Sequence, residues 1–197
     1  MFDLRVPRRP GLTGAVEHLR MRKALNVLYL AAAWAGAACV LLICALMLAQ
    51  ALLRLNGTLL RGADDITAWL CAAAAFLPLA STFKRGELVR MGILIDRFSD
   101  KAARWMELLA LSVAASFALY LAFWLTNFVY ESWLFDARGQ GLLPLPLWIP
   151  QAPVAVGAIV LAIALLDEWV RVAAGLAPTY VEQIRNRHAA GDYSGEV

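Results

Sequence analysis

Four long apolar blocks without a charged residue limit the possible folds of this chain most strongly. They run over 24–53, 66–83, 108–130 and 142–166. A helix needs about 20 apolar residues to cross the hydrocarbon core of a bilayer, with a range of roughly 17 to 25. Each block is therefore predicted to form one spanning helix. The predicted fold class is an all-α integral membrane protein with four transmembrane helices.

The composition and the prolines refine this prediction. Hydrophobic residues make up 61% of the chain and charged residues 17%, whereas a soluble domain has roughly 25% charged residues. We expect a cytoplasmic N-terminal tail over 1–23, a four-helix transmembrane domain over 24–172 and a cytoplasmic C-terminal tail over 173–197. The last helix is expected to begin near Pro150, because proline is tolerated in a first helical turn but poorly in an interior.

The distribution of basic residues predicts the orientation. Lys and Arg number six before the first block, then two, six and one in the three connections, and three after the last block. Basic residues accumulate on the cytoplasmic side, so both tails and the second connection are predicted to be cytoplasmic. Tryptophan favours the membrane interface. Trp105 is expected at the cytoplasmic interface, and Trp133 and Trp148 at the opposite one.

The second connection concentrates charge in the stretch FKRGELVRMGILIDRF, residues 83–98. Its apolar residues from Met91 to Phe98 follow helical spacing, which predicts a short amphipathic segment in the headgroup region; a solvated turn is the alternative. Gly86 is expected to let the chain leave the second helix in a left-handed conformation. The basic residues are expected to act in membrane placement and assembly, at about 1 kcal/mol each near an anionic leaflet: Lys84, Arg85, Arg90 and Arg97.

The sequence offers little for chemistry. No ionisable residue lies well inside a predicted span, and proton relays and ion pathways usually need such residues. The three cysteines are not paired as a thiol oxidoreductase or zinc site requires. We therefore expect no enzyme, catalytic residue, metal or cofactor. The basic residues lie beside apolar blocks, so nucleic acid is not an expected partner. Asp64 and Asp65 are expected to stabilise the start of the second helix.

Small residues four apart occur in three of the blocks. The pairs are Ala32 with Gly36, Ala68 with Ala72, and Ala158 with Ala162. Such faces let helix backbones approach closely in lipid. They indicate either contact with a larger membrane partner or packing among the chain's own helices.

Two stretches and the four-span plan resemble the small membrane subunit of the tripartite ATP-independent periplasmic (TRAP) transporters. In the first stretch, KRGELVRMGILIDRF, a basic residue and a glycine precede a short hydrophobic run with a basic and a later acidic residue. The residues that fit are Arg85, Gly86, Val89, Arg90 and Asp96. In the second stretch, ESWLFDARGQGLLPLPLWIPQAPVAVG, the residues that fit are Glu131, Ser132, Trp133, Pro146, Trp148, Pro153 and Gly157. Glu87 and Pro78 depart from the pattern of the family.

The resemblance implies a non-catalytic subunit in the bacterial inner membrane. It would form a static scaffold with a large multi-span permease subunit for sodium-coupled uptake of an organic acid. A periplasmic solute receptor would deliver that acid. Two alternatives remain at this point: a four-span accessory subunit of another carrier, such as the tricarboxylate type, and a membrane oxidoreductase subunit. The residues do not identify the solute.

Overall fold

The computed structural model describes residues 12–58, 60–85, 100–139, 141 and 144–175. Within these residues it confirms the all-α class with four membrane spans. The helices are α1 (Leu12–Leu55), α2 (Ala63–Phe76), α3 (Leu79–Arg85), α5 (Asp100–Leu134) and α6 (Trp148–Ala173). The stretches long and apolar enough to cross a membrane are Ala24–Leu55, Ala63–Arg85, Arg104–Leu134 and Trp148–Ala173.

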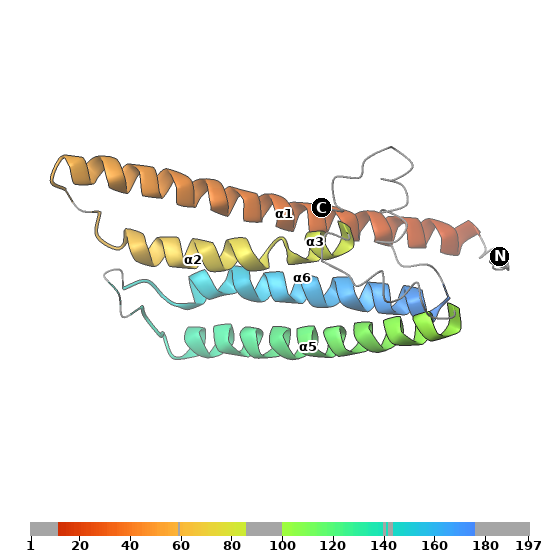
Figure 1. The fold of residues 1–197 in the computed structure, drawn as a ribbon. Coiled ribbons are helices and arrows are strands. Elements are labelled where there is room, and N and C mark those ends of the chain that lie inside the picture. The colour runs from red at the N-terminus through yellow and green to blue at the C-terminus, as the bar shows by residue number, and fades with distance from the viewer. Residues whose placement is uncertain (1–11, 59, 86–99, 140, 142–143, 176–197) are drawn as a thin grey trace, which may run out of the picture.

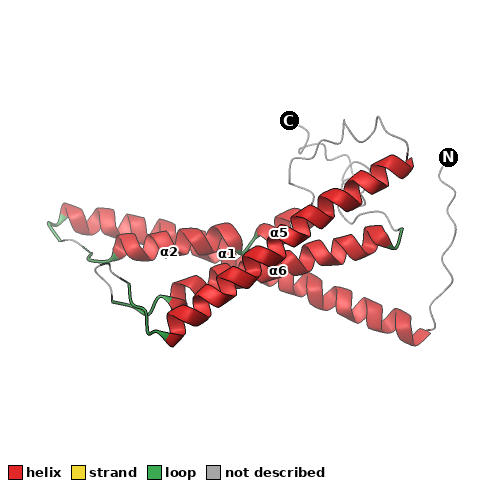
Figure 2. Ribbon diagram, turned by 90° about the horizontal axis from the view of Figure 1, so that it is seen from below, coloured by secondary structure: helices red, strands yellow, loops and turns green. Residues whose placement is uncertain are grey.

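The helices lie in a row rather than in a square bundle. Figure 1 shows α1 on one side, then α2 with α3, then α6, and α5 on the other side. α6 packs against α5, α2 and α3, while α1 packs mainly against α2 and α3. Seen from below, α1 and α5 cross each other widely (Figure 2). α6 is therefore the central helix, and α1 and α5 are the outer ones.

One end of the row carries the outer ends of the first and last helices, and the other carries two of the connections. At the tail end, α1 begins, α3 ends, α5 begins and α6 ends. At the turn end, α1 connects to α2 and α5 connects to α6. The first and last spans thus have their outer ends on the same side, as an even number of spans requires.

Alanine dominates the core. On α5, residues 111, 115, 118 and 122 are buried at alternating spacings of four and three, as on the inner face of a closely packed helix pair. On α6, Ala158 and Ala162 are buried, and on α1 so are Ala32 and Gly36. Two of the three predicted small-residue faces therefore pack inside the chain. Ala68 of the third is exposed.

The second span is broken, which the sequence did not lead us to expect. α2 stops at Phe76 and α3 starts at Leu79, with Leu77 and Pro78 between them. Proline has no N–H to continue the helical ladder, and its ring clashes with the preceding turn. The Pro78 carbonyl accepts hydrogen bonds from the Thr82 N–H at 3.0 Å and from the Ser81 hydroxyl at 2.8 Å. The chain thus resumes a helix at once.

Backbone hydrogen bonds join the two ends of the connection from α5 to α6 at the turn end. Arg138 and Pro146 form an isolated antiparallel bridge. The Gly139 N–H donates to the Leu145 carbonyl at 3.0 Å, and the Leu147 N–H donates to the Ala137 carbonyl at 2.9 Å. α6 then begins at Trp148, close to the predicted start. Pro153 lies inside this helix rather than at its first residues.

Candidate functional site

A polar cluster joins three helices at the tail end. The Lys84 ammonium of α3 donates to an Asp167 carboxylate oxygen of α6 at 2.7 Å. The side chains are only 13% and 26% exposed, so water screens the pair less than at an open surface. The same ammonium lies 4.6 Å from the ring centroid of Tyr29 on α1, within cation–π range. One lysine therefore connects α1, α3 and α6.

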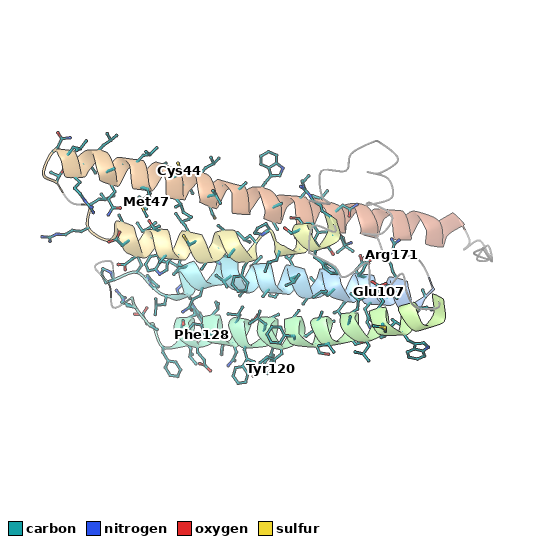
Figure 3. The ribbon with its side chains drawn as sticks, viewed as in Figure 1. Cys44, Met47, Glu107, Tyr120, Phe128 and Arg171 are labelled. Carbon is teal, nitrogen blue, oxygen red and sulfur yellow. The ribbon has the colours of Figure 1, made fainter. Side chains whose placement is uncertain are left out.

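Two further charged residues of α6 are buried beside this pair. Glu168 is 1% exposed and Arg171 is 8% exposed. A buried charge is costly unless it is paired and hydrogen-bonded, and each of the two residues has an interacting partner. Figure 3 shows Arg171 and Glu107 at this same end of α6 and α5. Sequence reasoning did not predict the burial of Glu168 or the pairing of Asp167 with Lys84.

The end of α6 is tied to the start of α5 by two hydrogen bonds. The Arg104 guanidinium donates to the Ala173 carbonyl at 3.0 Å, which satisfies one of the unpaired carbonyls at a helix C-terminus. The Trp169 indole N–H donates to the Ser112 hydroxyl at 2.8 Å. Gly175 follows with φ +83, the left-handed conformation in which helices commonly end.

The centre of the row is a close crossing at the Pro78 break. A Cβ added to Gly157 of α6 would lie 2.7 Å from backbone atoms of Phe76. A Cβ added to Gly36 of α1 would lie 2.9 Å from Cδ of Pro78. Because neither glycine has a side chain, α6 and α1 can both approach the break closely. Gly157, which fits the family pattern, thus lies against the residues just before Pro78, which departs from it.

The turn end has its own polar contacts. Asp64 accepts a hydrogen bond from the Gln50 amide of α1 at 3.2 Å. A Cβ added to Gly141 would overlap the Asp65 carboxylate, so Asp65 reaches the loop between α5 and α6. Both residues lie in the first turn of α2, whose N-cap is Gly62 without a side-chain cap. Their carboxylates can interact favourably with the positive end of the helix dipole. They also link α2 to its neighbours.

The other predicted site residues lie apart from one another. Glu131 accepts a hydrogen bond from the Asn127 amide at 2.9 Å near the end of α5. Trp105, Trp133 and Trp148 are 74%, 61% and 38% exposed, at helix ends, where aromatic residues meet a membrane interface. Arg85 is exposed at the end of α3. The expected amphipathic segment falls outside the described residues, together with four predicted site residues: Gly86, Arg90, Asp96 and Arg97.

No catalytic centre emerges from the described part of the chain. Within it, no group of three or more His, Cys, Asp or Glu side chains could hold a metal ion. Cys39, Cys44 and Cys71 are free thiols. The polar contacts described above join helices to one another at the two ends of the row.

Fold and contacts together define a small multi-pass membrane protein whose charged side chains gather at the ends of its spans. A comparison with protein families matches residues 39–175 to the tripartite ATP-independent periplasmic transporters, DctQ component. The match covers more than half of the chain. The chain therefore belongs to this family and is a small permease subunit of a TRAP transporter. Comparisons with curated proteins and with solved structures found no match.

Proposed function

We propose that this subunit is the non-catalytic, static part of a TRAP permease. It would bind a large multi-span subunit in the bacterial inner membrane and widen the scaffold against which the transport domain moves. Sodium-coupled uptake of an organic acid would take place in the large subunit, with the acid delivered by a periplasmic receptor. The family match carries this proposal, and it favours the TRAP type over the tricarboxylate type.

The contacts within the chain support a static role. A scaffold must keep its shape while its partner moves. The Lys84–Asp167 pair, the Arg104 hydrogen bond to α6 and the close crossing at Gly157 each connect helices that are distant in sequence. Ionisable side chains on the described spans lie near the helix ends, which leaves the middle of each span without the groups that ion pathways use.

The outer face of α1 is the surface that we assign to the large subunit. Residues 31, 35, 38, 42, 45 and 49 are exposed and follow alternating spacings of four and three. All are alanine except Leu42. Small residues at this spacing let a second helix approach closely in lipid. The sequence pattern alone did not separate this seam from the buried face of the same helix.

Co-expression tests the proposal directly. The tagged chain should recover the large permease subunit encoded with it from detergent extracts. Vesicles containing both subunits should take up solute when the periplasmic receptor and a sodium gradient are supplied. Vesicles containing this chain alone should take up no more than empty vesicles. Sodium-dependent uptake by the chain alone would contradict a scaffold role.

Orientation is a separate expectation. Alkaline phosphatase fused after Arg138 should be active, because the single basic residue of that connection predicts a periplasmic position. A fusion after Arg97 should be inactive. The opposite pair of activities would reverse the assigned topology, with both tails then outside the cytoplasm.

A further inference from the structure

A hollow lies between α5 and α6 at the tail end, with a volume of about 730 Å³. Its lining includes Trp105, Leu108, Leu109 and Trp169, with Arg104 at the same site. The volume falls within the range of about 300 to 1,000 Å³ that is usual for ligand sites. The lining is thus largely apolar and carries one cation.

Two polar side chains in the wall of this hollow, Trp169 and Ser112, already have hydrogen-bond partners. The Trp169 N–H donates to the Ser112 hydroxyl at 2.8 Å, and that hydroxyl donates to the Leu108 carbonyl at 2.7 Å. These bonds fix the indole of Trp169. A ligand therefore meets mainly aromatic and aliphatic surface there.

Arg104 retains hydrogen-bonding capacity for a ligand. Its guanidinium has several N–H donors. Among the described residues it makes one hydrogen bond, to the Ala173 carbonyl at 3.0 Å. That bond holds the cation beside the hollow while the side chain remains exposed. An anion is the complementary ligand group, and guanidinium pairs well with phosphate.

The position of the hollow further limits the class of ligand that it could bind. Arg104 is the first residue of one membrane span and Ala173 is the last residue of another. The cation therefore lies at the depth where both spans end, and the apolar wall continues toward the hydrocarbon. A phospholipid presents a phosphate and an acyl chain at this depth. We infer that the hollow binds an anionic phospholipid, with its phosphate at Arg104 and the upper part of a chain against Trp105, Leu109 and Trp169.

Native mass spectrometry of the full-length chain with equal amounts of phosphatidylglycerol and phosphatidylethanolamine tests this inference. We expect phosphatidylglycerol to be retained preferentially. Arg104→Gln should lower the ratio of bound phosphatidylglycerol to phosphatidylethanolamine about fivefold, which is the usual contribution of one basic residue near anionic lipid. Arg104→Lys should keep most of the preference. The matched control is Arg61→Gln at the turn end, also an exposed arginine, which should leave the ratio unchanged.

A steric variant separates binding from stability. Arg104→Gln also removes the hydrogen bond to α6, but a lower yield of folded protein would not change the ratio of the two lipids. Ala173→Phe keeps the cation and fills the hollow, so total bound lipid should fall. An unchanged ratio in Arg104→Gln, unchanged binding in Ala173→Phe, or displacement of the lipid by inorganic phosphate alone would each overturn the inference. None of these results depends on the transport role.

Discussion

In the most apolar window of α6, 39% of the residues are buried within the chain, whereas in that of α1 only 6% are buried. α6 contacts every other described helix, and its inner face carries glycine, alanine and charged residues. The buried residues of α1 are Tyr29, Ala32 and Gly36, among those whose side chains are described. A helix that packs on its own chain needs small residues inside. α1 has small residues outside as well, and this difference points to a second packing partner.

α5, the other outer helix, exposes several large aromatic side chains, whereas the described part of α1 exposes one, Trp34. Figure 3 shows Tyr120 on the outer side of α5, away from the row. Phe117, Tyr120, Phe123 and Trp124 are 67%, 63%, 66% and 50% exposed. Bulky aromatic residues keep a neighbouring backbone at a distance, in contrast to alanine. We therefore assign the face of α5 to lipid and the face of α1 to the large subunit.

The largest loss of stability is expected when the ion pair between α6 and α3 is broken. Lys84→Met removes one partner of the Lys84–Asp167 pair and leaves a poorly solvated carboxylate on α6. Breaking such a pair costs about 3 kcal/mol, so thermal unfolding in detergent should shift clearly downward. Lys84→Met combined with Asp167→Leu should recover part of the loss. A double variant less stable than both single variants would contradict the ion pair as the stabilising contact.

A smaller loss is expected at the close crossing. Gly157→Ala places a Cβ 2.7 Å from the Phe76 backbone, which cannot move aside as a side chain can. Overpacking of this kind costs about 2 kcal/mol. The matched variant on α1 is Gly36→Ala, which meets the edge of the Pro78 ring. It should be milder because α1 is held by fewer contacts and can shift. Stability is measured by thermal unfolding of both variants. Equal losses of stability would contradict the view that α1 is attached less firmly than α6.

The sequence predicted the spans but not how they meet. A long uncharged block predicts a segment that is buried in lipid or protein. The four spans can therefore be predicted from hydropathy alone. The break at Pro78 and the glycines that hold it depend on three helices at once. Likewise, Lys84 and Asp167 are far apart in sequence, and charge at a helix end predicts an interface position rather than a partner. Hydropathy does not distinguish the inner face of α1 from its exposed alanine seam, because both are apolar.

Replacing an alanine of the α1 seam by a large residue should affect assembly more than folding. Ala38→Trp puts an indole into the face assigned to the large subunit, and recovery of that subunit should fall about tenfold, or roughly 1.4 kcal/mol. Ala37→Trp is the matched control, since it is an exposed alanine about 100° further round the helix. It should be recovered normally. Equal recovery for both variants would remove α1 from the interface.

The smallest effect is expected at Tyr29, where α1 meets the charged cluster of α6. Its side chain is 3% exposed, and its hydroxyl has no hydrogen-bond partner among the described residues. Tyr29→Phe keeps the ring that faces the Lys84 ammonium, and removing an unpaired buried hydroxyl relieves a desolvation cost. Stability should therefore stay within about 0.5 kcal/mol of the parent chain or rise slightly. Tyr29→Leu also removes the ring and its cation–π contact, so it should be the less stable of the two in the same unfolding measurement. A clear loss in Tyr29→Phe would show that the hydroxyl donates to a group of the tail end, and α1 would then be attached to α6 more firmly than its low burial indicates.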